Sequence, residues 1–133
     1  MAEIIFANIC KKHKRNDIII KGAGTDTENG LRMSSNAIDA LVKCGEKIGK
    51  KLKLSTCWDD SMLAEFDHII CMTKHHAHEI NPKGNHKNVY TLDDITGCGD
   101  IFDPWCYPID VYIEVCKQLQ QSLQILYDRV CRT

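Results

Sequence analysis

Strand signals alternate with helix signals in the middle of this chain, and that order limits its fold more than any other feature. Residues 68–72 form a nearly continuous apolar run, as expected for a strand covered on both faces. Residues 74–80 have helical character and stop at Asn81-Pro82, before a second strand candidate over residues 89–92. A short helix is also expected over residues 58–66. This order of elements predicts an α/β fold with a parallel sheet.

Two amphipathic segments predict the helices that cover the sheet. The first begins at Ser34 or Ser35, either of which can cap a helix, and ends near Gly45. The second begins near Pro108 and is much longer. Its apolar side chains recur at helical spacing along one stripe, at Tyr112, Val115, Cys116, Leu119, Leu123, Leu126 and Val130.

The first part of the chain holds two short apolar runs. Three isoleucines at residues 18–20 precede Gly22-Ala23-Gly24, which predicts a strand followed by a turn. Residues 4–7 could form a strand or part of a helix, because short apolar runs are not assigned by periodicity alone. The side chains that would share one helix face here are Ala2, Phe6, Ile9 and His13. Lysines follow, and we favour the helix.

Length, charge and cysteine usage indicate the class of protein. The chain has 133 residues, which fits a single domain over residues 1–133. Its formal net charge of −1 gives no field that would recruit nucleic acid or an anionic membrane. It shows neither a secretion signal nor an apolar run of membrane-spanning length. Its eight cysteines include no Cys-x-x-Cys pair, so we expect a reduced, cytoplasmic protein with mostly buried thiols.

Two motifs bear on metals and cofactors. His75 and His78 lie one helical turn apart, but a zinc site needs three or four converging ligands and no suitable partner motif is present. Gly22-Ala23-Gly24 lacks the third glycine of a dinucleotide-binding fingerprint. We therefore expect neither a metal nor a cofactor.

The cysteines were compared with the spacing that a phosphate-binding nucleophile requires. A phosphate dianion bound beside a thiolate needs backbone N–H groups and an arginine fork, which a Cys-x5-Arg loop supplies. Cys10 has Asn16 at that position, and Arg15 is one residue too early. For six of the other cysteines, the residue six positions later is Lys50, Leu63, Ala77, Pro104, Tyr112 or Ser122. No cysteine of the sequence qualifies.

Asp103-Pro104-Trp105 is the strongest remaining candidate for chemistry. It ends residues 93–104, which we expect to form a long loop rich in Asp and Gly. A carboxyl fixed by a following proline, beside a large aromatic side chain, suits a general acid above a phosphate site. Asp-Pro by itself usually only starts a turn, so it indicates a general acid only if the surrounding segments support that role.

Several segments, taken in order, resemble the low-molecular-weight protein tyrosine phosphatase family. Met1-Ala2-Glu3 and the apolar helix after it resemble the segment that follows the Cys-x5-Arg-Ser-Pro loop of that family. The other segments that resemble its strands, loops and helices are residues 18–25, 30–41, 66–73, 88–92 and 100–104. The resemblance covers nearly all of the chain, and the shared order and spacing make it specific.

The resemblance implies a fold and a reaction. The fold is a three-layer, flavodoxin-like parallel sheet flanked by helices. The reaction is the hydrolysis of a phosphorylated protein or small phosphomonoester through a phosphocysteine. Asp103 matches the residue that protonates the leaving oxygen and then deprotonates the attacking water. Trp105 matches the aromatic that lines the cleft beside the substrate.

The departures from the family pattern concern its nucleophile loop. In this alignment the first strand and the whole loop fall before Met1, so we expect a domain that is incomplete at its N-terminus. Gly22 stands where relatives have a serine that braces the loop. Residues 49–52 stand where relatives usually carry a serine and a histidine that support it. Truncation, a mis-set start codon and natural loss of the segment all remain open.

These departures lead to two expectations. The strands at residues 18–20 and 69–71 would each lose a neighbour, so we expect either a homo-oligomer through exposed strand edges or a substitute strand from residues 4–7. The chain itself is expected to be an inactive phosphatase. The alternatives are a non-catalytic phosphate- or protein-binding module and an arsenate reductase-like protein, although the latter needs a cysteine relay that the spacing does not show.

Overall fold

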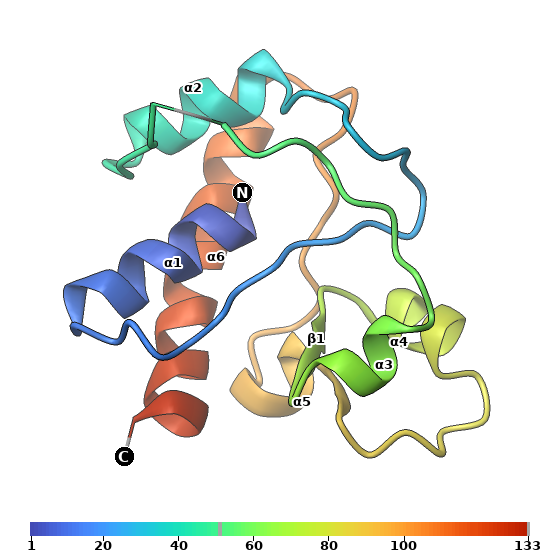
Figure 1. The fold of residues 1–133 in the computed structure, drawn as a ribbon. Coiled ribbons are helices and arrows are strands. Elements are labelled where there is room, and N and C mark those ends of the chain that lie inside the picture. Colours follow the sequence, from blue (N-terminus) through green and yellow to red (C-terminus); the bar gives the residue numbers. More distant parts are fainter. Residues whose placement is uncertain (51, 133) are drawn as a thin grey trace.

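The computed structural model describes residues 1–50 and 52–132 (Figure 1). Two strands and six α-helices are followed by one π-helical turn in this part of the chain. In order, the elements are α1 (Ala2–Lys12), α2 (Ser35–Lys43), α3 (Met62–Glu65), β1 (Ile69–Cys71), α4 (Lys74–Ile80), β2 (Val89–Thr91), α5 (Leu92–Thr96), α6 (Ile109–Leu126) and the π-helical turn η1 (Tyr127–Cys131). Most of the chain is therefore helical or irregular.

The sheet confirms the predicted fold class. β1 and β2 pair in parallel, with Ile69 opposite Val89 and Cys71 opposite Thr91, and α4 lies between them in the chain. Parallel strands need such a crossover, so the strand–helix–strand order in the sequence predicted the topology correctly. The protein has an α/β fold with helices on both sides of a parallel sheet, which contains two strands in the described residues.

Two apolar cores lie on opposite sides of β1, and Figure 1 shows α1, α2 and α6 on one side and α3 and α4 on the other. Side chains alternate along a strand, so Ile70 packs against the main core while Ile69 and Cys71 belong to the second core. The second core also contains Ile80 of α4. The prediction that this strand is covered on both faces is confirmed.

The helix predictions at both ends of the chain are confirmed. Residues 2–12 form α1, so the alternative in which residues 4–7 supply a substitute strand is wrong. Ser34 caps α2 by accepting a hydrogen bond from the backbone N–H of Ala37 at 3.2 Å. Helix α6 begins after Pro108 and buries the predicted stripe as far as Leu126, while Val130 lies in η1. Helices α1 and α2 both pack against α6.

The predicted strand at residues 18–20 does not form. Residues 18–23 make no backbone hydrogen bond within the described residues, and a lone bridge between Gly24 and Cys57 follows. Ile18 and Ile20 pack against the main core, but Ile19 is 86% exposed. β-branched residues favour an extended backbone, whereas a strand also requires a neighbour to pair with.

Two other boundaries differ from the prediction. The helix expected over residues 58–66 is formed only by Met62–Glu65. Residues 93–104 are not one long loop, because Leu92–Thr96 form α5. Thr91 and Asp94 exchange side-chain to backbone hydrogen bonds of 2.9 and 3.0 Å at the start of this helix. Such a reciprocal pair stabilises even a very short helix.

Candidate active site

The candidate general acid lies on a loop after α5, residues 100–108, which we call the Asp103 loop. Its first two residues, Asp100 and Ile101, form hydrogen bonds with α4, with α6 and with the residue that follows β1. The Asp100 carboxylate accepts a hydrogen bond from the Lys74 N–H at the start of α4 (3.3 Å), and its carbonyl accepts one from Gln118 of α6 (3.2 Å). The N–H of buried Ile101 donates to the Met72 carbonyl, just after β1, at 3.0 Å. The loop therefore starts at the carboxyl end of the sheet, where ligands of parallel α/β folds bind.

Asp103 itself lies in a tight turn with an exposed side chain. Its Oδ1 accepts a hydrogen bond from the backbone N–H of Trp105 at 3.1 Å, and the Tyr107 N–H donates to the Pro104 carbonyl at 2.9 Å. Cys106 has a φ of 69°, a left-handed conformation that non-glycine residues rarely adopt. Buried Pro104 anchors the turn. The carboxyl is accessible from solvent.

Three aromatic residues lie on the same loop as this carboxyl. Trp105 is 67% exposed, and the rings of Phe102 and Tyr107 meet edge to face with their centroids 5.1 Å apart. Both of these rings are about half exposed. The Asp103 loop therefore carries three exposed aromatic side chains, the residue type that commonly lines a site for a ring-bearing substrate.

Cys10 and Arg15 lie closer together than their sequence spacing suggested. Both line a cavity of about 350 Å³ next to Ile18 and Ile20. The Cys10 thiol is only 3% exposed, and burial raises its pKa, with a further contribution from Cys131. A nucleophilic thiol requires the opposite change, a lowered pKa.

The backbone around Cys10 has the wrong polarity for a phosphate. Cys10 occupies the last turn of α1, where its carbonyl accepts the Arg15 N–H at 2.9 Å and the Lys11 carbonyl accepts the Lys14 N–H at 3.0 Å. The C-terminal end of a helix presents carbonyl oxygens and a partial negative charge, whereas anions bind at N-terminal ends. The Arg15 guanidinium is occupied by two 2.9 Å hydrogen bonds to Asp17 and one to the Cys131 carbonyl. The helix end thus offers carbonyl oxygens and the guanidinium is already paired, an arrangement unfavourable for holding a phosphoryl group.

All eight cysteines are free in the structure. Burial raises the pKa of Cys71 to about 11 and is also the main cause of the raised pKa of Cys116, about 12. Cys106 is exposed on the Asp103 loop, one residue after Trp105.

The positions that brace the nucleophile loop in relatives have other neighbours here. Gly22 lies against Glu3, whose Oε2 would be 3.3 Å from an added Cβ, and Glu3 forms a 2.9 Å ion pair with Lys53. Gly49 and Lys50 are exposed, and Lys51 lies outside the described residues.

The histidines of α4 do not gather metal ligands. His75 Nε2 lies 2.6 Å from Glu79 Oε1, one helical turn away on the same exposed face. No group of three potential metal ligands occurs among the described residues.

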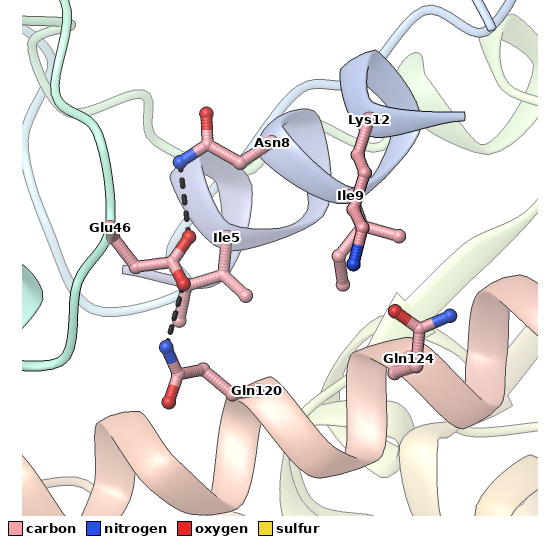
Figure 2. Close-up of a pocket in the computed structure, with 7 residues that line it drawn as sticks. All are labelled: Ile5, Asn8, Ile9, Lys12, Glu46, Gln120 and Gln124. Atoms are coloured by element: carbon pink, nitrogen blue, oxygen red, sulfur yellow. Dashed lines mark hydrogen bonds between the residues drawn. The ribbon is translucent and has the colours of Figure 1, made fainter. Parts of the chain in front are cut away.

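A polar cleft that sequence reasoning missed lies between α1 and α6 (Figure 2). It measures about 230 Å³. Figure 2 shows Glu46 between two amides: Asn8 Nδ2 donates to Oε1 at 3.0 Å and Gln120 Nε2 to Oε2 at 2.6 Å. These three side chains fasten the segment after α2 to both helices. They are 38 and 74 residues apart in sequence, so no local pattern could have predicted them.

No α-helix in residues 1–50 and 52–132 is long and apolar enough to span a membrane.

Comparison with known proteins assigns this architecture to a class of phosphatases. The sequence profile of the family described as low molecular weight phosphotyrosine protein phosphatase matches residues 1–133. The protein-arginine-phosphatase of Bacillus subtilis (strain 168) is 27% identical over 130 residues, covering 95% of this chain and 84% of the relative. The chain therefore belongs to the low molecular weight phosphotyrosine protein phosphatase family, and the resemblance inferred from its motifs is confirmed.

Solved structures agree on the fold. The low molecular weight protein tyrosine phosphatase of T. tengcongensis superposes with a TM-score of 0.85 at 24% identity, covering 97% of this chain and 88% of that one. The YwlE arginine phosphatase of Geobacillus stearothermophilus gives a TM-score of 0.82 at 22% identity, covering 98% of this chain and 82% of that one. At these identities the likeness establishes the fold alone.

Proposed function

We propose that the 133 residues carry the acid-loop side of a phosphatase site and do not themselves hydrolyse phosphomonoesters. The observation that carries this proposal is the state of Cys10, the thiol that shares a cavity with Arg15. It is buried at the C-terminal end of a helix, and its arginine is bound to Asp17 and to a carbonyl. Formation of a phosphocysteine needs a thiolate in a cradle of N–H groups, which this environment does not supply.

Asp103 and Trp105 are the residues of the site that the chain retains. We assign Asp103 the role of general acid, which donates a proton to the leaving group and later takes one from the attacking water. We assign Trp105 to the wall of the substrate cleft. The support is an exposed carboxyl held in a turn of a loop that starts at the carboxyl end of β1, with three exposed aromatic side chains on the same loop.

The substrate class follows from the family. Phosphorylated proteins and small phosphomonoesters are the substrates that a complete site of this kind would take. Relatives are named both as arginine phosphatases and as tyrosine phosphatases, so a phosphoarginine and a phosphotyrosine side chain are the two forms to compare. Asp103 would protonate a nitrogen in the first case and an oxygen in the second.

The test is an assay of the purified chain with para-nitrophenyl phosphate and with a phosphoarginine peptide. We expect release of phosphate at the rate of the buffer alone, because no thiol can form the phosphoenzyme. Cys10→Ser and Asp103→Asn are measured in parallel. Turnover above background that either substitution abolishes would overturn the proposal, since it would show a working nucleophile or acid in these residues.

We also propose that the chain self-associates through its strand edges. Residues 18–23 are extended without backbone partners in the described part of the chain, and β1 has a neighbour on one side only. Ile19 presents an apolar side chain to solvent at the same place. Unpartnered backbone beside an exposed apolar residue is a template for pairing with another copy.

A further inference from the structure

Cys44 lies directly over one face of α6. The residue caps the C-terminal end of α2, and its thiol donates to the carbonyl of Ile113 at 3.9 Å. Its own carbonyl accepts a hydrogen bond from Gln120 Nε2 at 3.0 Å. Ile113, Cys116 and Gln120 follow one another at spacings of three and four on the same helix face. Cys116 therefore lies under Cys44, between the two positions that Cys44 contacts.

The two sulfurs are neighbours in different surroundings. Cys116 is fully buried in the main core, whereas Cys44 is partly exposed. Burial is the main cause of the raised pKa of Cys116, about 12, and the neighbouring Cys44 thiol and the charge of Glu46 raise it further. The mechanism proposed for the Asp103 site uses neither of these thiols.

The segment that carries Cys44 is held in place on both sides. Gln120 and Asn8 of α1 both donate to Glu46 (Figure 2). Gln120 also donates to the Cys44 carbonyl, and Asn8 donates to the Lys47 carbonyl at 3.0 Å. These bonds keep the end of α2 seated on α6. A disulfide requires two Cα atoms within about 7 Å and facing Cβ atoms, and the bonds to α6 keep the Cys44 backbone from moving away from that helix.

We propose that Cys44 and Cys116 are a peroxide-sensitive thiol pair that forms a reversible disulfide and fastens α2 to α6. In the first step the Cys44 sulfur attacks hydrogen peroxide, the O–O bond breaks, and sulfenic acid and water form. In the second step the Cys116 thiolate attacks the Cys44 sulfur, the S–O bond breaks, and a second water leaves. The pair loses two electrons and two protons, and the peroxide is reduced to two waters.

The surroundings of Cys44 and Cys116 determine how fast the disulfide forms. A raised pKa leaves little thiolate on Cys116 near neutral pH, so the second step is slow there and accelerates as the pH rises. A dithiol reductant reverses the bond by thiol–disulfide exchange.

The test is peroxide treatment of the folded chain at pH 7 and pH 9, followed by alkylation, proteolysis and mass spectrometry. We expect a cross-link between Cys44 and Cys116, formed faster at pH 9, and alkylation of the other six of the eight cysteines. Cys44→Ser and Cys116→Ala should each abolish the cross-link. Cys57→Ser, which removes another partly exposed thiol, should retain it.

Two results would overturn the proposal. One is a cross-link that joins other cysteines, such as Cys10 and Cys131, which lie near each other at the C-terminal end of α1. The other is over-oxidation of Cys44 without any cross-link. A second measurement checks the fastening: the oxidised chain should melt at a higher temperature than the reduced chain, and dithiothreitol should reverse the difference. The Cys44→Ser variant should show no such difference.

Discussion

Thr91 connects a strand to a helix through one side chain. It is the last residue of β2, and its hydroxyl accepts the Asp94 N–H at 2.9 Å while the Asp94 carboxylate accepts the Thr91 N–H at 3.0 Å. Thr91 is only 4% exposed, so these bonds replace water that the buried groups cannot reach. The change of direction after the sheet depends on this pair.

Replacing Thr91 by valine should lower the free energy of unfolding by about 1–2 kcal/mol, because the shape is kept and the acceptor for the helix N–H is lost. Thr91→Ser retains the acceptor and is the matched control, with a smaller effect. Urea denaturation followed by circular dichroism measures both. Equal stability of Thr91→Val and the parent chain would show that the capping bond contributes nothing.

The hydrogen bonds between Thr91 and Asp94 also make the stability of the fold depend on pH. The hydrogen bonds from Thr91 lower the pKa of Asp94 in the folded state. A depressed pKa stabilises the fold above the pKa of the unfolded chain, and this contribution is lost as the pH falls through the folded value. Asp94→Asn lacks this titration, so the stability difference between it and the parent should shrink toward acidic pH.

Among the elements, α6 contributes most to the main core. Its stripe from Tyr112 to Leu126 is buried against α1 and α2, and Leu119 is 3% exposed in the middle of it. Apolar residues recur at helical spacing along the 18 residues of α6, and this pattern predicted both the helix and its buried face. Long amphipathic helices are readily predicted because the pattern repeats over several turns.

Leu119→Ala should destabilise the protein by about 2–5 kcal/mol, since it removes buried methyl groups and leaves a cavity. Val42→Ala on α2 is the control, because Val42 is 61% exposed and its truncation should change stability by less than about 0.5 kcal/mol. Thermal and urea unfolding measure both variants. Similar losses in the two variants would contradict the assignment of the core.

Short elements were harder to predict, for specific reasons. Residues 18–20 have strand composition but no partner in the described chain, and pairing is not visible in local sequence. Helix α5 was missed although Thr91-x-x-Asp94 is a capping signal that could have found it. Asp103 and Trp105 were predicted as site residues from their motif, and that role stays a prediction; their hydrogen bonds and exposure became known only from the structure.

At the scale of the whole molecule, the two apolar cores meet only across a narrow sheet. β1 separates them, and it is three residues long. The extended residues 18–23 pass without backbone partners within the described residues, with Ile19 exposed. This is the region where an added strand would join the existing elements most readily.

Analytical ultracentrifugation over a range of concentrations should therefore detect a dimer or larger species. Ile19→Lys places a charge at the proposed contact and should shift the population toward monomer. Val42→Lys introduces the same charge at another exposed apolar position and serves as the control. A monomer at every concentration, or equal dissociation by both variants, would contradict self-association through this edge.

The anchoring of the Asp103 loop has a consequence for how such a protein can change over time. Its first residues are secured to β1, α4 and α6 by bonds that involve neither a nucleophile nor a substrate. Folding of the scaffold therefore places the Asp103 carboxyl, whether or not the protein is catalytic. Loss of catalysis would leave the acid loop intact, and the persistence of its shape is no record of an active enzyme.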